Sequence, residues 1–200
     1  MVGAAASVAG LIDEATAHLS STLGLDRREA RIEARALAVH AWGIETAWLI
    51  AHDTDIPDGT QRAVFLTLIE QRLTGRPVAY LTGTREFYGR PFGVTPNVLI
   101  PRPETELLVE QALQHLPAGQ PSRVLDLGTG SGCVAITLAL ERPQARVTAV
   151  DRSLPALALA ERNARGLGAK VRFLQSDWFS SLGGERFDLI VGNPPYVAAD

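Results

Sequence analysis

From Arg123 onward, apolar runs of strand length alternate with segments of helical period. The runs are RVLDLG, RVTAVD, VRFLQSD and FDLIVGN, and the helical segments SGCVAITLALERP and SLPALALAERNARGLG separate the first three. Strand–helix–strand repetition with near-continuous apolar strands is typical of an α/β fold, a parallel sheet covered on both faces. Right-handed crossovers would place all four strand ends at one edge of the sheet, where ligands bind in such folds.

The residues before this alternation predict two further parts. Residues 1–75 have helical period throughout, with Asp26 expected to cap one helix, and Asp58 or Thr60 another. Residues 76–102 contain several turn signals and predict a linker with a β-hairpin, whose turn contains YGRP between two aromatic-rich runs. Residues 103–200 then begin with a helix and continue into the alternating segment.

Composition excludes several classes of protein. The chain has 200 residues, a net charge of −3 and one cysteine, so neither a surface coated for nucleic acid nor an internal disulfide is expected. The apolar N-terminal run has no preceding Lys or Arg and is soon interrupted by Asp13 and Glu14, which argues against secretion. No run is long enough to span a membrane. We therefore expect a cytoplasmic protein without membrane or direct nucleic acid contact.

The first two strand ends predict a nucleotide-like ligand. DLGTGSG, residues 126–132, is a glycine-rich turn from a strand into a helix, which could approach a ligand closely or serve only as a tight loop. Asp151 ends the second strand about 20 residues later, where a carboxylate could accept hydrogen bonds from ribose hydroxyls. Asp151 could equally cap the following helix, and the two roles are compatible.

The other two strand ends carry aromatic and amide groups. After the third strand, Asp177 could accept a hydrogen bond from an adenine amino group while Trp178 or Phe179 covers the face of the adenine ring. A Trp at this position could equally belong to the core. After the fourth strand, NPPY at residues 193–196 ends the sheet with a rigid extended turn. Its carbonyl and carboxamide acceptors and its phenol ring could hold a planar amide or amine.

This turn raises the question of how an unreactive amide nitrogen would be modified. We expect no cysteine, metal cluster or histidine base near the strand ends, so the chemistry would depend on positioning and on an activated electrophile. A sulfonium methyl donor is such an electrophile.

These motifs carry a family resemblance. The glycine turn, Asp151 and NPPY together resemble class I S-adenosylmethionine-dependent methyltransferases that act on planar nitrogens. The stretch GRPVAYLTGTREFYGRPFGVTPNVLIPRPETELLVE is more specific and resembles the peptide chain release factor N(5)-glutamine methyltransferases, the PrmC/HemK family. The resemblance covers essentially the whole chain and implies a Rossmann-like methyltransferase core preceded by a helical domain.

The resemblance implies a set of site residues and a partner. S-adenosyl-L-methionine would be the methyl donor and the Gly-Gly-Gln loop of a peptide chain release factor the substrate, with no metal. The donor would be bound by Asp126, Gly128, Thr129, Gly130, Ser131, Gly132, Asp151, Asp177, Trp178 and Asn193. The substrate glutamine would be held by the catalytic group Asn193, Pro194, Pro195 and Tyr196. Residues 102–106, with Arg102 and Glu104 among them, would border the same pocket.

The helical domain would contact the release factor. Its candidate surface is the group Arg27, Arg28, Arg31 and Arg35, which could equally be a solvated helix face pairing with Glu29 and Glu33. A complete class I methyltransferase has seven strands, so the resemblance predicts further chain beyond Asp200 and a fold truncated after its fourth strand. The alternatives are an adenine-N6 DNA or RNA methyltransferase, a ribosomal-protein glutamine methyltransferase, or a non-catalytic fragment that binds release factors.

Overall fold

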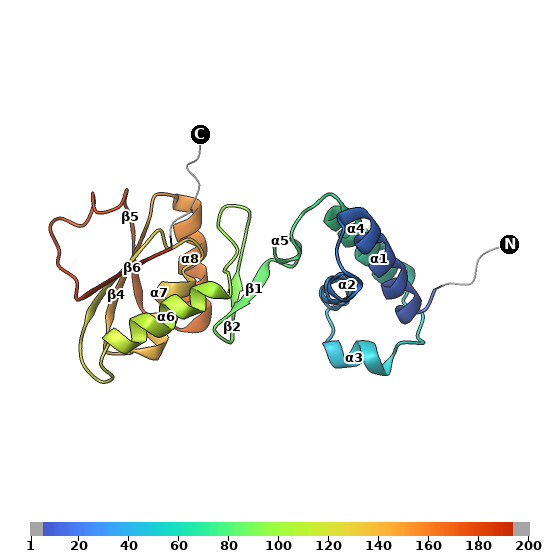
Figure 1. Cartoon of the computed structure of the whole chain (residues 1–200), viewed down its shortest axis with the longest axis horizontal. Helices are drawn as coiled ribbons and strands as arrows, with labels where there is room; N and C mark the ends of the chain where they lie inside the picture. The colour runs from blue at the N-terminus through green and yellow to red at the C-terminus, as the bar shows by residue number, and fades with distance from the viewer. Residues whose placement is uncertain (1–5, 194–200) are drawn as a thin grey trace. The chain divides into compact units, whose positions relative to one another are not determined.

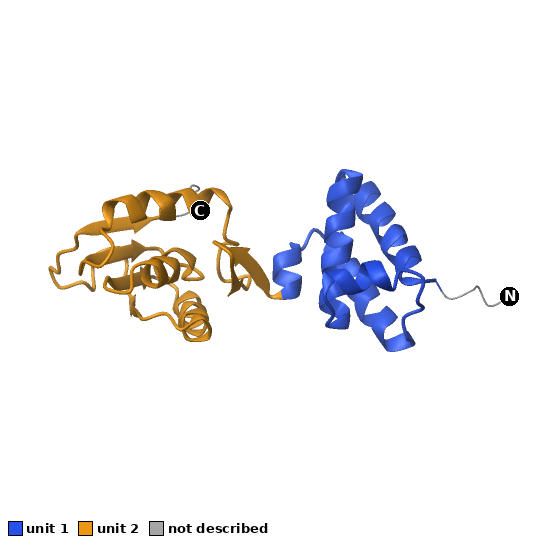
Figure 2. Cartoon of the chain, turned by 90° about the horizontal axis from the view of Figure 1, so that it is seen from below, with its two compact units in different colours: residues 1–82 blue, residues 83–200 orange. Residues whose placement is uncertain are grey.

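The computed structural model describes residues 6–193. It divides into two compact units, residues 1–82 and residues 83–200, which Figure 2 shows in separate colours. The predicted catalytic residues Pro194, Pro195 and Tyr196 lie outside the described residues.

The first unit is helical, as predicted. Its helices are α1 (Val8–Leu23), α2 (Arg27–Trp42), α3 (Thr46–Ala51), α4 (Gly59–Leu73) and α5 (Val78–Thr82). The predicted caps are confirmed: the Asp26 carboxylate accepts hydrogen bonds at the start of α2, and Asp58 forms a capping box with Gln61 at the start of α4. The sequence pattern did not predict α5, which is five residues long and packs on α2 and α4.

The core of the helical unit forms where α1, α2 and α4 meet. Leu11, Leu19, Leu37 and Phe65 are fully or almost fully buried there. Ala30, Ala34 and Ala38 are also buried on α2, and their small side chains allow α1 and α4 to pack closely against it. Within residues 6–193, no helix has the length and apolar character needed to cross a membrane.

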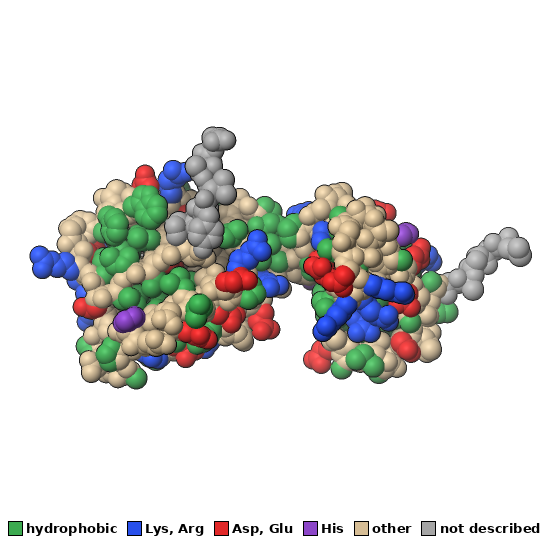
Figure 3. Space-filling model, in the orientation of Figure 1, with side chains coloured by type: hydrophobic (Ala, Val, Ile, Leu, Met, Phe, Trp, Pro, Cys, Tyr) green, Lys and Arg blue, Asp and Glu red, His purple; other side chains and the backbone are tan. Residues whose placement is uncertain are grey.

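Lys and Arg side chains gather over α2, with acidic side chains beside them (Figure 3). Arg31 forms an ion pair with Asp13 of α1 at 3.2 Å. Glu33, which the sequence paired with its neighbours on α2, is instead held by Arg72 of α4, whose Nε lies 2.8 Å from the carboxylate. The alternative in which Glu33 pairs with arginines of α2 is therefore wrong, because the packing of α4 on α2 brings the Arg72 guanidinium to Glu33. Contact of this surface with a release factor stays a prediction.

The second unit begins with the predicted hairpin. Strands β1 (Thr84–Phe87) and β2 (Arg90–Gly93) pair antiparallel. Tyr88 and Gly89 form the two-residue turn, with φ of 52° and 68°, which is typical of a type I′ hairpin turn. Arg90 and Pro91, which were also predicted in the turn, instead begin β2 and pair with Phe87 and Glu86. Phe87 and Phe92 are buried and meet edge to face with ring centroids 6.0 Å apart.

The predicted α/β core follows. Four parallel strands are described, β3 (Arg123–Leu127), β4 (Arg146–Asp151), β5 (Val171–Gln175) and β6 (Leu189–Gly192), in the order β5-β4-β3-β6. Figure 1 labels β4, β5 and β6 of this sheet. The helices are α6 (Glu104–His115), α7 (Cys133–Glu141) and α8 (Leu154–Leu167). Near the carboxyl ends of β3, β4 and β6, Asp126 lies between Ala149 and Val191, which brings the strand ends to one edge, as expected.

The core of the α/β unit is formed by apolar side chains of the strands and of α7. Val124, Val147, Ala149 and Ile136 are buried in one cluster. α7 packs against β3, β4 and β5, and α8 against β4 and β5. Since the strand order proceeds from β3 to β4 to β5, right-handed crossovers place α7 and α8 on the same face of the sheet.

Candidate functional site

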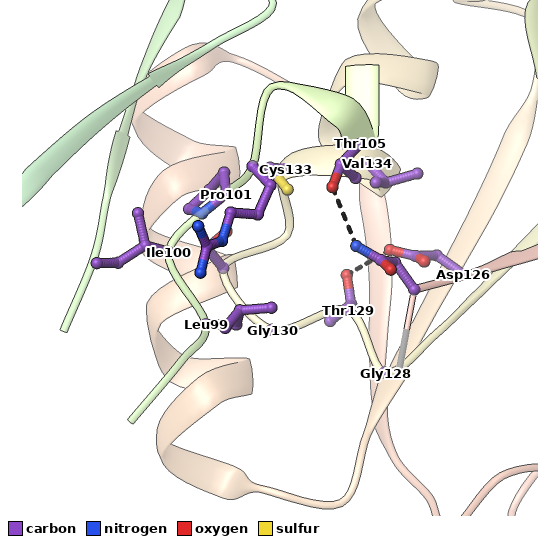
Figure 4. Close-up of a pocket in the computed structure, with 13 residues that line it drawn as sticks. Leu99, Ile100, Pro101, Thr105, Asp126, Gly128, Thr129, Gly130, Cys133 and Val134 are labelled. Atoms are coloured by element: carbon purple, nitrogen blue, oxygen red, sulfur yellow. Dashed lines mark hydrogen bonds between the residues drawn. The ribbon is translucent and has the colours of Figure 1, made fainter. Parts of the chain in front are cut away.

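A pocket lies at the carboxyl edge of the sheet. It is lined by Leu99, Ile100, Pro101, Arg102, Thr105, Asp126, Gly128, Thr129, Gly130, Ser131, Cys133, Val134 and Asn193. In Figure 4, Leu99, Ile100 and Pro101 lie on one side and Asp126 and Thr129 on the other. The pocket therefore joins three segments that are far apart in the sequence: the stretch before α6, the glycine turn and the end of β6.

The glycine turn has a backbone that only glycine adopts readily. Gly128, Gly130 and Gly132 have φ of 70°, 54° and 82°. A Cβ at Gly128 or Gly130 would meet open space, whereas a Cβ at Gly132 would lie 2.8 Å from Cδ1 of Ile136. The first two glycines thus leave room beside the backbone for a ligand, and the third allows α7 and α8 to pack closely.

Asp151 braces this turn. One carboxylate oxygen accepts from the Gly130 N–H at 2.9 Å, and the other accepts from the Ser153 N–H at 2.9 Å. Ser153, rather than Asp151, is the N-cap of α8, so the capping alternative for Asp151 is wrong. The ribose-binding role of Asp151 stays a prediction.

Asn163 of α8 fixes the other side of the turn. Its Nδ2 donates to the carbonyl of Ser131 at 2.8 Å and to the carbonyl of Gly93 at 3.0 Å, and its Oδ1 accepts from the Gly93 N–H at 2.9 Å. The hairpin and the glycine turn are thereby held by one side chain. Asn163 was not among the predicted site residues, although its polar side chain on an otherwise apolar helix face was the available signal.

The Asp126 carboxyl is buried beneath the turn. The Thr129 hydroxyl donates to it at 2.7 Å (Figure 4). Burial raises the pKa of Asp126 to about 6, although this hydrogen bond favours the charged form. Asp126 therefore supports the turn from inside the protein.

Cys133 contradicts the expectation that no cysteine lies near the strand ends. It is the first residue of α7 and lines the pocket. Its place directly after Gly132 was the signal that could have found it. Burial raises the pKa of the thiol to about 12, so the sulfur is protonated at neutral pH and is not an activated nucleophile.

The remaining predicted residues are divided between the pocket and its surroundings. Arg102 and Asn193 line the pocket, whereas Glu104 is exposed at the start of α6 and is not part of the lining. Asp177 and Trp178 are exposed after β5, also outside the lining. Trp178 is 55% exposed with φ of 51°, which excludes the core alternative, and its role with adenine stays a prediction.

The amide of Asn193 contacts the first turn of α6. Its Nδ2 donates to Oγ1 of Thr105 at 3.0 Å (Figure 4). Thr105 lies in the stretch 102–106 that was predicted to border the pocket, but its contact with Asn193 was not predicted. Across residues 6–193, no group of three or more His, Cys, Asp or Glu side chains is arranged to hold a metal ion.

Comparison with known proteins adds family relationships to this geometry. The PrmC N-terminal domain matches residues 11–83, and the Methyltransferase small domain matches residues 104–200. A release factor glutamine methyltransferase of Bordetella pertussis is 55% identical over 171 residues, covering 85% of this chain and 63% of that protein. The release factor glutamine methyltransferase of Escherichia coli is 48% identical over 169 residues, covering 84% of this chain and 60% of that protein. The chain belongs to the PrmC/HemK family.

This PrmC/HemK chain spans 60–64% of the length of the curated relatives that it matches. Among solved structures, the T. Thermophilus 16S rRNA N2 G1207 methyltransferase, in complex with AdoMet and guanosine, is 28% identical with a TM-score of 0.46. That match covers 58% of the PrmC/HemK chain and 33% of the other. The sequence relatives and the family models carry the family assignment.

Proposed function

We propose that the protein is an S-adenosyl-L-methionine-dependent methyltransferase that acts on the side-chain amide nitrogen of a glutamine. The substrate we propose is the glutamine of the Gly-Gly-Gln motif in peptide chain release factors. The names of its PrmC/HemK relatives support this substrate, because they are release factor glutamine methyltransferases at 48–55% identity. The cytoplasmic location stays a prediction.

One observation carries the proposal. The glycine turn and the Asn193 carboxamide line the same pocket, although they lie more than 60 residues apart in the sequence. A donor bound along the turn and an amide held by Asn193 would therefore be neighbours. Methyl transfer to a weakly nucleophilic nitrogen needs this proximity more than it needs an acid or a base.

The residues present fit such a donor. The open space beside Gly128 and Gly130 lets a ligand lie against the turn, with the N-terminus of α7 behind it. Asp151 would accept from ribose hydroxyls and Asp177 from the adenine amino group, with Trp178 against the base. When bound, the donor supplies a sulfonium methyl group as the electrophile.

Asn193 would act on the substrate side of the pocket. Its Oδ1 would accept an N–H of the substrate glutamine, which orients the amide nitrogen and increases its electron density. Pro194 and Pro195 would supply carbonyl acceptors, and Tyr196 would lie against the plane of the amide. The donor would supply the methyl group and leave as the thioether, and the substrate nitrogen held by Asn193 would release one proton to solvent.

The test uses the full-length protein, S-adenosyl-L-methionine and a purified release factor. Mass spectrometry of the peptide containing Gly-Gly-Gln should show one added methyl group on the glutamine. A release factor with that glutamine replaced by alanine should gain none. Asn193→Ala should abolish turnover and leave donor binding largely intact. An unmodified glutamine after incubation with the wild-type enzyme, or methylation of adenine in nucleic acid instead, would refute the proposal.

A further inference from the structure

The hydrogen bond between Thr105 and Asn193 joins two parts of the pocket that lie 88 residues apart in the sequence. Thr105 is the second residue of α6 and is only 7% exposed, and Asn193 follows β6. The threonine hydroxyl oxygen accepts from the asparagine Nδ2 at 3.0 Å (Figure 4). Both residues line the pocket. The first turn of α6 therefore contacts the Asn193 carboxamide, which we propose binds the reacting amide of the substrate.

This contact orients the Asn193 carboxamide. The nitrogen and oxygen of an amide lie on opposite branches of one plane, so holding the nitrogen against α6 turns the oxygen to the other branch. A rotation of the side chain would lose this hydrogen bond and leave the buried Thr105 hydroxyl without it. The amide is thus held in one orientation before a substrate arrives.

α6 is a rigid base for this contact. Near its start, the Glu106 carboxylate accepts from the Tyr88 N–H of the hairpin turn at 2.8 Å. At its end, the Arg142 guanidinium donates to the carbonyls of Leu113 at 3.0 Å and Leu116 at 2.7 Å. Val109 of α6 is fully buried in the core of the α/β unit. Thr105 therefore occupies a position fixed from both ends of its helix.

We propose that Thr105 is a positioning residue, whose hydroxyl presents Oδ1 of Asn193 to the substrate amide. This inference rests on the proposed function. Thr105 acts through Asn193, so its loss should slow the chemical step while the donor site, built on the glycine turn, is retained. A buried group misplaced by about 1 Å can cost on the order of 100-fold in rate, so we expect a loss of about 10- to 100-fold in kcat.

The experiment compares Thr105→Val and Thr105→Ser in the full-length enzyme. Valine keeps the shape but removes the hydroxyl, and serine restores it. Thr105→Val should lower kcat by about 10- to 100-fold with donor affinity within about twofold of wild type, and Thr105→Ser should recover most of kcat. Thr137→Val is the matched control, because Thr137 is fully buried on α7 and its hydroxyl has no hydrogen-bond partner among the described residues. This control should keep wild-type kcat.

A second measurement separates this inference from the proposed function. The side-chain NH₂ protons of Asn193, followed by nitrogen-edited NMR, should be protected from exchange in wild type and in Thr105→Ser, and exposed in Thr105→Val. Equal protection in wild type and Thr105→Val overturns the positioning role, whatever the substrate proves to be. Wild-type kcat in Thr105→Val, or an equal loss in the serine variant, overturns it as well. A wild-type enzyme that leaves the glutamine unmodified while the NMR difference persists refutes only the proposed substrate.

Discussion

The buried Asp126 carboxyl should make the stability of the α/β unit fall as pH rises. Burial raises its pKa in the folded protein from 3.8 to about 6, so folding favours the protonated form. The associated stability is fully present below about pH 3.8, the unfolded value, and is lost as pH rises through about 6.

The size of this effect follows from the two pKa values. The difference between 3.8 and about 6, at about 1.36 kcal/mol per pKa unit, gives a total loss of about 3 kcal/mol in the free energy of unfolding from acid to neutral pH. Most of the loss is complete by pH 7.5. Between pH 5 and pH 7.5, linkage gives a decrease of about 1.4 kcal/mol in the free energy of unfolding from this one carboxyl.

Asp126→Asn removes the titration and keeps an oxygen that can accept from the Thr129 hydroxyl. Urea unfolding followed by hydrogen exchange mass spectrometry, with peptides from β3 and β4, reports on the α/β unit separately from the helices. The stability of wild type relative to Asp126→Asn should fall by about 1.4 kcal/mol between pH 5 and pH 7.5. Thr129→Val should move the titration to higher pH, because the lost hydroxyl favoured the charged form. Parallel pH profiles for wild type and Asp126→Asn would refute this reasoning.

Two further substitutions test the framework of the site. Gly132→Ala should destabilise the protein by about 2 kcal/mol, because its φ is 82° and the new Cβ would lie 2.8 Å from Cδ1 of Ile136. Gly166→Ala, in open space on α8, should instead be neutral or stabilise by up to about 1 kcal/mol, and thermal denaturation compares the two. Asn163→Ala should speed amide exchange at Gly93 and weaken donor binding, as measured by calorimetry, since it removes all three contacts to the hairpin and the glycine turn. Unchanged exchange at Gly93 would contradict this role.

The sheet and the pocket edge were predictable from the sequence for a physical reason. Buried parallel strands need apolar side chains on both faces, so β3, β4 and β6 appear as short apolar runs. The carboxyl ends of such strands meet at one edge, which predicts that Asp126 and Asn193 lie at the same site, and both line the pocket. The type I′ turn at Tyr88–Gly89 was marked by its glycine.

The parts that were missed depend on contacts between distant residues. The hydrogen bond of Thr105 to Asn193 was missed because the two residues lie 88 positions apart in the sequence. Asn163 was missed for the same reason, since its partners belong to the hairpin and the glycine turn. α5 is too short to show a period, and its helical form comes from packing on α2 and α4. The local sequence pattern identifies helices and strands, whereas the hydrogen bonds between them can be found only from the folded structure.

The two hydrogen bonds of Asp151 have a consequence for the kinetics of ligand capture. Because the carboxylate already ties Gly130 to the start of α8, the turn acquires its shape during folding and not upon encounter with a ligand. A preorganised binding site loses little conformational entropy on association, so the binding free energy is not reduced by the cost of ordering the turn. Capture should then be limited by diffusion and desolvation, with a single-exponential approach to equilibrium and no slow rearrangement phase.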